Sequence, residues 1–174
     1  MTKRTFFHLS ICAFSFAFLT GCGPEEGEAK KRYAFVTNGA AEFWTIAEAR
    51  ANQASADLGV DVSVLMPGSL SDQKQMVGDA ITRATDGVAI SPIDPENQND
   101  MLNKVAAATR LVTHDSDAPD SDRLAYIGMD NYTAGRMCGK LVKEALPDGG
   151  KVMILIGHME QDNSRERRQR VIDE

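Results

Sequence analysis

Residues 86–92 read Asp-Gly-Val-Ala-Ile-Ser-Pro. The Asp86-Gly87 pair is typical of a turn, and the apolar run after it predicts a buried strand over residues 88–91. Pro92 ends that strand, because proline cannot donate a hydrogen bond to a neighbouring strand. Short strands that are apolar throughout, without alternation, are typical of a parallel sheet covered on both faces. This stretch therefore favours an α/β fold.

Amphipathic segments flank that strand on both sides. Apolar residues recur at helical spacing over residues 76–84, and Ser71 can cap the helix that they predict. After the strand, Asp94 and Pro95 favour the start of another helix. The same alternation continues along the chain, with strands predicted at residues 33–37, 60–66, 111–114, 124–128 and 151–156 and helices at 42–58, 131–145 and from about 164. We expect a doubly wound parallel sheet with flanking helices.

The first 21 residues predict a secretory signal peptide. A basic start is followed by a mostly apolar run over residues 6–19, which is too short to span a bilayer. The sequence LTGC at residues 19–22 resembles the bacterial lipobox, so we expect Cys22 to carry lipid. Residues 22–30 are rich in Gly and Glu and predict a tether. The protein is therefore expected in the periplasm or cell envelope, lipid-anchored to a membrane.

The net charge and the cysteine content argue against two classes of function, nucleic-acid binding and cysteine catalysis. The chain has 25 acidic and 19 Lys or Arg residues, a net charge of −6, which argues against nucleic acid as a partner. Cys12 falls in the signal peptide and Cys22 takes lipid, so Cys138 is left without a disulfide partner. Cys138 shares an apolar helix face with Met137 and Leu141, and we expect it to be a buried structural thiol rather than a nucleophile.

Known motifs of catalysis and cofactor binding are missing from the sequence. It contains no GxGxxG or GxxxxGK[ST] loop, no GxSxG elbow and no HExxH pair. His114 and His158 have no neighbours at the spacing of metal ligands. We therefore expect a binding protein that is not an enzyme and that holds no metal and no cofactor.

Candidate ligand-binding residues follow the predicted strands, because parallel sheets bind ligands beyond the carboxyl ends of their strands. Phe43 and Trp44 come after the first strand, Asp115 comes after the fourth, and residues 157–170 end in a cluster of arginines. Aromatic faces pack against the C–H groups of a sugar, while carboxylate and guanidinium groups bind its hydroxyls. This set suits a polyhydroxylated ligand.

Each of these residues also has a structural interpretation, which the sequence leaves open. Trp44 lies in phase with the apolar face of its helix and could belong to the core. Asp115 could cap a local turn. The arginine cluster is also typical of a solvated helix face.

Several short motifs, in order along the chain, resemble the ribose-binding-protein-like branch of the periplasmic sugar-binding proteins. The matching residues are Thr37, Phe43-Trp44, DGVAISP at 86–92, HDSDA at 114–118, YIGMDN at 126–131 with Ala134-Gly135, and Asn163 with Arg167. The resemblance covers residues 31–174. It implies the periplasmic binding protein type 1 fold, in which two lobes close on a monosaccharide by a hinge and present it to the permease of an ABC importer.

The resemblance also assigns roles to particular residues. Thr37 matches the small polar residue after the first strand, and Phe43 with Trp44 matches the aromatic pair that stacks on the sugar. Asp115 matches the acidic group that accepts the sugar hydroxyls, and Arg167 matches an arginine from the second lobe.

Three positions depart from the family pattern. Ser116 occupies a ligand-binding position that is Arg in many members. Ala41 stands where ribose binders have Asn, and Glu42 replaces the usual Pro. Two polar contacts of the ribose site are therefore not expected, which argues against ribose as the ligand.

The resemblance places the first lobe at residues 31–128 and the hinge crossing with the start of a second lobe at 129–174. Because the family's second lobe needs more βα units, we expect that lobe to be incomplete. A truncated remnant and a periplasmic sensor for a receptor kinase are therefore alternatives to the importer. A LacI-type repressor is disfavoured, since it would carry a DNA-binding headpiece where this chain has its signal peptide. The sequence leaves open which sugar binds, which membrane holds the lipid and the oligomeric state.

Overall fold

The computed structural model describes residues 29–174. The predicted signal peptide, Cys22 and most of the predicted tether lie outside the described residues. Among residues 29–174, no helix is both long enough and apolar enough to cross a membrane.

A five-stranded parallel sheet forms the centre of the molecule, with the strand order β2-β1-β3-β4-β5. The strands are β1 (Arg32–Val36), β2 (Asp61–Leu65), β3 (Gly87–Ile90), β4 (Arg110–His114) and β5 (Ala125–Ile127). Val36 pairs with Leu65 on one side and Ile90 on the other, so the carboxyl ends of the strands lie level. The strand order reverses beside β1, as expected of a doubly wound sheet.

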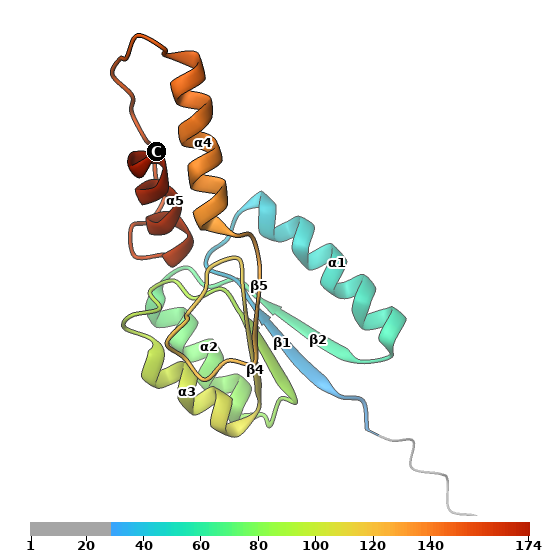
Figure 1. Cartoon of the computed structure of the whole chain (residues 1–174). Coiled ribbons are helices and arrows are strands. Elements are labelled where there is room, and N and C mark those ends of the chain that lie inside the picture. Colours follow the sequence, from blue (N-terminus) through green and yellow to red (C-terminus); the bar gives the residue numbers. More distant parts are fainter. Residues whose placement is uncertain (1–28) are drawn as a thin grey trace, which may run out of the picture.

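Three helices cover the sheet, and two more form a separate pair (Figure 1). Helix α1 (Glu42–Leu58) lies on one face, and α2 (Leu70–Thr82) and α3 (Asn99–Ala108) lie on the other. Helices α4 (Asn131–Ala145) and α5 (Asp162–Asp173) pack against each other beyond the carboxyl ends of the strands. The predicted α/β fold is confirmed, and the bounds predicted for α1 and α4 match the observed ones.

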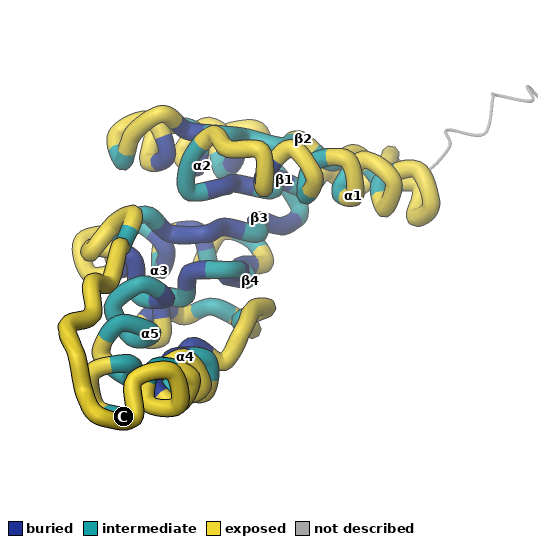
Figure 2. The backbone as a smooth tube through the Cα atoms, turned by 90° about the horizontal axis from the view of Figure 1, so that it is seen from above, coloured by how far each residue is buried: buried dark blue, intermediate teal, exposed yellow. Residues whose placement is uncertain are grey.

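The core lies between the sheet and the α2 and α3 helices. Side chains of alternate strand residues meet the apolar faces of these helices, which gives the buried cluster Ala34, Val36, Val77, Ala80, Val88, Ile90, Leu102, Val105, Leu111 and Ala118. Figure 2 shows this burial along β1, β3 and β4, whereas the outer sides of α1 and α4 are exposed.

The α1 face of the sheet is covered less completely. Of the α1 residues, only Trp44 is buried, and Leu58 at the far end is 74% exposed. An apolar groove of about 430 Å³ runs between α1 and the sheet and is lined by Ala51, Ala54 and Val62 among others. The predicted apolar face of α1 therefore lines a groove rather than a closed core.

Two predicted helix starts were wrong in detail. The hydroxyl of Ser69, not that of Ser71, caps α2 by accepting from the Asp72 backbone N–H at 3.1 Å. Helix α3 begins at Asn99 rather than at Asp94. Asp94 instead accepts hydrogen bonds from the backbone and side chain of Asn97, which holds a separate turn before the helix.

The predicted strand over residues 151–156 does not form. Val152, Met153 and Leu155 are 50%, 82% and 86% exposed, and this segment pairs with no strand of the described chain. A strand is stabilised by hydrogen bonds to a neighbour, and the five-stranded sheet does not extend to this segment. Apolar sequence alone was therefore not sufficient to predict it.

Cys138 is exposed, so the prediction of a buried thiol was wrong. Helix α4 packs on α5 through Gly135 and Gly139, which lie on a different face of the helix. The apolar face of Met137 and Leu141 is left 60% and 63% exposed. The small glycines allow the two helix backbones to approach closely, and this approach decides which face is buried.

Candidate functional site

The candidate site lies where three neighbouring strands end. Asn38, Ser91 and Asp115 follow β1, β3 and β4, which are adjacent in the sheet. Because these strands are parallel, the three side chains meet at one edge of the sheet. Asp115 has a φ of 59°, a backbone conformation that Asp adopts more readily than most residues and that directs its side chain toward the other two.

The carboxylate of Asp115 is held on one oxygen. Its Oδ2 accepts hydrogen bonds from Asn38 Nδ2 at 3.2 Å, Ser91 Oγ at 3.2 Å and Asn163 Nδ2 at 3.3 Å. No residue among 29–174 donates to Oδ1. The half-buried carboxylate therefore keeps one oxygen that can accept a hydrogen bond from a ligand.

An aromatic group lies beside this carboxylate. The rings of Phe43 and Trp44 meet edge to face with centroids 4.8 Å apart, and Trp44 is 5% exposed whereas Phe43 is 61% exposed. The indole Nε1 of Trp44 donates to Asn38 Oδ1 at 2.9 Å. The ring of Phe43 is therefore largely exposed, and the buried ring of Trp44 packs against it.

His114 supports the aromatic group from inside the sheet. Its ring stacks on Phe35 at 4.2 Å and meets Trp44 edge to face at 5.5 Å. Burial lowers the pKa of His114 to about 4, and this effect outweighs the opposing pull of backbone carbonyls at Val36 and Ala89. The imidazole is therefore neutral near pH 7 and packs as an aromatic ring.

Helix α5 brings polar groups to the same place from another part of the chain. The Asn163 side chain contacts Asp115, and the Nε of Arg167 donates to the Asn163 backbone carbonyl at 3.2 Å. That contact uses one donor group of the guanidinium, and no residue among 29–174 accepts from the terminal nitrogens of Arg167. Arg165 on the same helix pairs with Glu96 in the turn before α3.

Thr37 and Ser116 lie behind the site surface, and both are fully buried. The hydroxyl of Thr37 donates to the Gly39 carbonyl at 2.6 Å, which fixes the turn that leads to Asn38. The backbone N–H of Ser116 donates to Ser91 Oγ at 3.3 Å. Of the six residues predicted to bind ligand, the structure gathers Phe43, Trp44, Asp115 and Arg167 around one region and places these two beneath it.

The segment that leads from β5 to α4 is connected to the site by hydrogen bonds. The hydroxyl of Tyr126 donates to the backbone carbonyl of Asp115 at 2.8 Å, and the Asn131 side chain donates to the Met129 carbonyl at 3.2 Å. Burial raises the pKa of Tyr126, so its hydroxyl stays protonated and can donate. The predicted hinge near Met129 thus lies next to the backbone of the central carboxylate.

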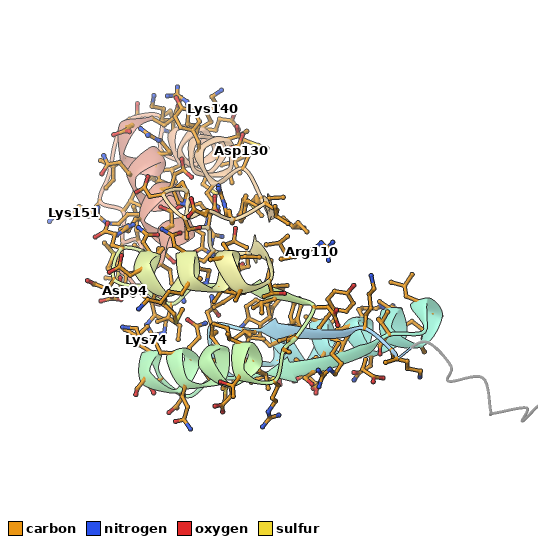
Figure 3. The ribbon with its side chains drawn as sticks, turned by 90° about the horizontal axis from the view of Figure 1, so that it is seen from below. Lys74, Asp94, Arg110, Asp130, Lys140 and Lys151 are labelled. Atoms are coloured by element: carbon orange, nitrogen blue, oxygen red, sulfur yellow. The ribbon has the colours of Figure 1, made fainter. Side chains whose placement is uncertain are left out.

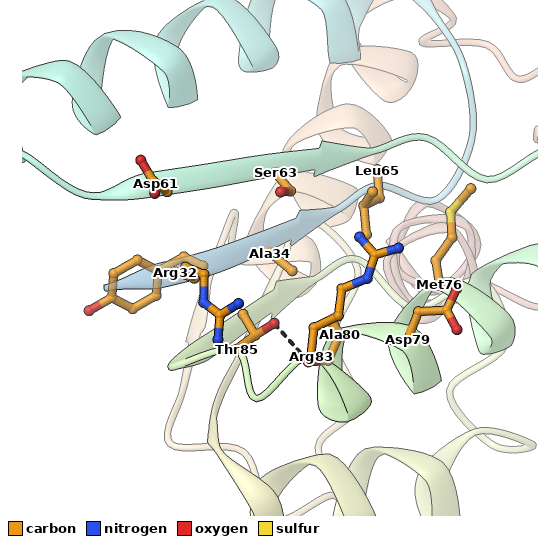
Figure 4. A pocket seen from close by; sticks show the side chains of 11 residues that line it. Arg32, Ala34, Asp61, Ser63, Leu65, Met76, Asp79, Ala80, Arg83 and Thr85 are labelled. Atoms are coloured by element: carbon orange, nitrogen blue, oxygen red, sulfur yellow. Dashed lines mark hydrogen bonds between the residues drawn. The ribbon is translucent and has the colours of Figure 1, made fainter. Parts of the chain in front are cut away.

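Other polar side chains lie away from this site. Arg110, at the amino end of β4, and Lys140, on α4, point outward (Figure 3). A cavity of about 350 Å³ lies between the second half of α2 and strands β1 and β2, and Arg32, Asp61 and Arg83 line it (Figure 4). This cavity reaches Leu65 at the carboxyl end of β2, but its lining includes none of Asn38, Ser91 and Asp115. Residues 29–174 contain no group of three metal-binding side chains close enough to hold an ion.

The sequence did not point to three residues of this site. Asn38 and Ser91 stand within stretches that were recognised, but no role was assigned to them, and Asn163 served only to support the resemblance. Their position directly after neighbouring parallel strands was the available signal for the first two. The contact of Asn163 with Asp115 joins residues 48 apart in sequence, and no local pattern shows it.

Comparisons with known proteins agree with this geometry. Residues 33–174 match the model of the periplasmic binding protein domain family. The chain therefore belongs to the periplasmic binding protein domain family. A comparison with curated protein sequences found no match.

Solved structures of sugar-binding proteins share the fold. An ABC transporter solute-binding protein from Burkholderia graminis, in complex with D-arabinose, is 30% identical with a TM-score of 0.78 over 84% of this chain and 52% of that one. GanP, a glucose-galactose binding protein from Geobacillus stearothermophilus, is 25% identical with a TM-score of 0.78, over 83% and 53%. A sugar-binding protein of a Bacillus halodurans sugar ABC transporter is 28% identical with a TM-score of 0.71, over 82% and 50%. The chain spans about half the length of these proteins.

Proposed function

We propose that this chain binds a monosaccharide between the sheet domain (residues 31–128) and the α4–α5 pair, and that it presents the sugar to an ABC-type importer. The observation that carries the proposal is the Asp115 carboxylate, which is fixed through Oδ2 by donors from both parts of the chain and keeps Oδ1 for a ligand. An oriented carboxylate beside an aromatic face is the chemistry that sugar hydroxyls and C–H groups require.

Each predicted residue has a part in this proposal. Phe43 offers its exposed ring to the C–H face of the sugar, and Trp44 fixes the position of that ring. Arg167 donates to hydroxyl oxygens from the α5 side. Thr37 and Ser116 shape the loops beneath the sugar rather than contacting it through exposed surface. Closure of residues 129–174 over residues 31–128 would exclude water from these hydrogen bonds and strengthen them.

The remaining predictions complete the proposal. Residues 1–21 direct export, Cys22 carries lipid, and residues 22–30 hold the domain away from the membrane. The D-arabinose complex of the similar Burkholderia graminis protein favours a pentose as the ligand, and the similarity to the glucose-galactose binding protein GanP favours a hexose. The similar structures are sugar-binding proteins, two of them from ABC transporters, and favour the importer over the sensor for a receptor kinase.

Titration of the full chain with sugars tests the proposal. The chain has a single Trp, so its fluorescence reports on Trp44 alone. We expect at least one pentose or hexose to change the emission, and Asp115→Asn to weaken that binding by roughly 10- to 100-fold, since a hydrogen bond to a charged group is lost. The matched control is Asp57→Asn, at the exposed end of α1, which should leave the affinity unchanged. If calorimetry and fluorescence both show no binding of any pentose, hexose or polyol, the proposed function is wrong.

A further inference from the structure

Asn38 lies between the two side chains that form the candidate site. Its Oδ1 accepts from the Trp44 indole at 2.9 Å, and its Nδ2 lies 3.2 Å from Asp115 Oδ2. One half-buried amide group therefore contacts both the aromatic and the acidic part of the site. The sequence alone assigned no role to this position.

Chemistry fixes the direction of these hydrogen bonds. An indole N–H can only donate, and an ionised carboxylate can only accept. The carbonyl of Asn38 must therefore face Trp44, and its amino group must face Asp115. Among residues of this size, only an amide carries both an acceptor and a donor in this arrangement. An Asp at this position would place a second carboxylate against Asp115, and a Leu would form neither contact.

Ser91 makes the arrangement more rigid. Its Oγ lies 3.0 Å from Asn38 Nδ2 and 3.2 Å from Asp115 Oδ2, and it accepts from the Ser116 backbone N–H. With that acceptance, the serine proton is free to point at the carboxylate. Asn38 and Ser91 therefore both contact Oδ2, and Oδ1 is left without a donor from residues 29–174.

We propose that Asn38 is a positioning residue that couples the orientation of the Trp44 indole to that of the Asp115 carboxylate. The effect of Asn38 on sugar affinity rests on the proposed function. The coupling itself is a property of the chain without sugar, so it can be tested separately.

The first test observes the indole N–H resonance of Trp44 by NMR in the full chain without sugar. Only one such resonance exists, because Trp44 is the only Trp. We expect Asn38→Leu to shift it in the direction of a lost hydrogen bond. Asn38→Asp should shift it less, because Asp retains the acceptor for the indole and loses only the donor to Asp115. Asp115→Ala should also shift the resonance, and by less than half as much when Asn38→Leu is already present. Asn52→Leu, at an exposed position of α1, is the matched control.

The second test measures the affinity of the sugar identified for the wild-type chain. Asn38→Leu and Asn38→Asp should each weaken binding by roughly 10- to 100-fold, the range expected for lost hydrogen bonds to a charged group. In the Asp115→Asn background, Asn38→Asp should cost at least tenfold less. The two carboxylates then no longer repel each other, and the amide introduced at position 115 can donate to the new carboxylate at position 38.

The outcomes separate the two proposals. If the wild-type chain binds no sugar, the proposed function fails, and the NMR result alone decides the role of Asn38. If the resonance ignores Asn38→Leu, or moves equally with Asp115→Ala in both backgrounds, the coupling is refuted. Additive losses of affinity would likewise refute it. Dispersed amide spectra of the variants show that they fold, and Asn38→Asp keeps the side-chain volume if Asn38→Leu does not fold.

Discussion

An ion pair between Arg165 and Glu96, which are 69 residues apart in sequence, connects α5 to the turn before α3. The Nη1 of Arg165 on α5 lies 2.6 Å from Oε1 of Glu96 in the turn before α3. Arg165 also lies 3.6 Å from Asp162 on its own helix. Together with the contact between Asn163 and Asp115, this ion pair connects the α4–α5 pair to the sheet domain.

Breaking this ion pair should have a small effect that depends on salt. The Glu96 side chain is 70% exposed and the Arg165 side chain 33% exposed, so water and ions screen most of the attraction. We expect Glu96→Gln to weaken sugar binding by less than about fivefold at low salt and to have no measurable effect at high salt. Calorimetry at two salt concentrations measures this. A loss that is as large at high salt would show that Glu96 acts by another route.

Enlarging Gly135 should separate α4 from α5. A Cβ at this position would lie 2.6 Å from both the backbone carbonyl oxygen of Arg167 and the Cβ of Arg170. Neither group can move without shifting the helix, so we expect Gly135→Ala to destabilise the helix pair by about 1–3 kcal/mol. Hydrogen exchange of the α5 amides measures this loss of stability.

Gly78 provides the matched control for that experiment. It is exposed within α2, and a Cβ there would have open space. Gly78→Ala should therefore stabilise its helix by roughly 0.5–1 kcal/mol, because alanine is the better helix former. If hydrogen exchange of the α5 amides is equally faster in each of the two single variants, the packing explanation is contradicted.

Acid should destabilise the fold through His114. Its pKa is about 4 in the folded chain, against 6.5 for the free side chain, so the unfolded chain binds more protons between these values. Stability from this group is fully present above about pH 6.5 and is lost as the pH falls toward 4. The loss between pH 7 and pH 5 should be about 2 kcal/mol.

Denaturant unfolding at these two pH values measures that loss, and His114→Phe is the variant that removes it. The Phe ring preserves the stacking on Phe35 and has no proton to gain. Burial raises the pKa values of Asp162 and Glu166, so these groups favour the folded chain as the pH falls and oppose the His114 effect. The difference between wild type and variant isolates the histidine, and equal pH dependence in both would contradict the assignment.

Removal of the Cys22 thiol tests the proposed lipid anchor. We expect Cys22→Ala to leave the signal peptide unprocessed at this position and to block incorporation of labelled fatty acid into the protein. Cys138→Ala, which removes the exposed cysteine of α4, should leave labelling unchanged. Fatty-acid labelling that persists in Cys22→Ala would place the lipid elsewhere.

Most of the sheet domain could be predicted because its signals are local. Short apolar strands and the helical spacing of apolar residues in α1 and α4 can be recognised from a few neighbouring residues, and α1 ends at Gly59 for an equally local reason. Gly59 adopts a φ of 65°, which glycine tolerates without strain.

Apart from the two helix starts, which local hydrogen bonds decide, the errors arose where partners far away in sequence determine the outcome. The 151–156 segment has strand sequence, but no neighbouring strand is described for it. Cys138 shares an apolar face, yet the glycines of α4 determine which side meets α5. Asn38 received no role because its importance depends on Trp44 and Asp115 meeting in space.

The strand order has a consequence for how the chain assembles. Each strand after β1 pairs with a strand that precedes it in the sequence: β2 and β3 add to β1, β4 adds to β3, and β5 adds to β4. A chain that emerges from its amino terminus can therefore build the sheet one strand at a time, without waiting for a later segment. The candidate site is completed only when Asn163 and Arg167 of α5 follow the last strand, so synthesis from the amino terminus forms the sheet first and the binding chemistry last.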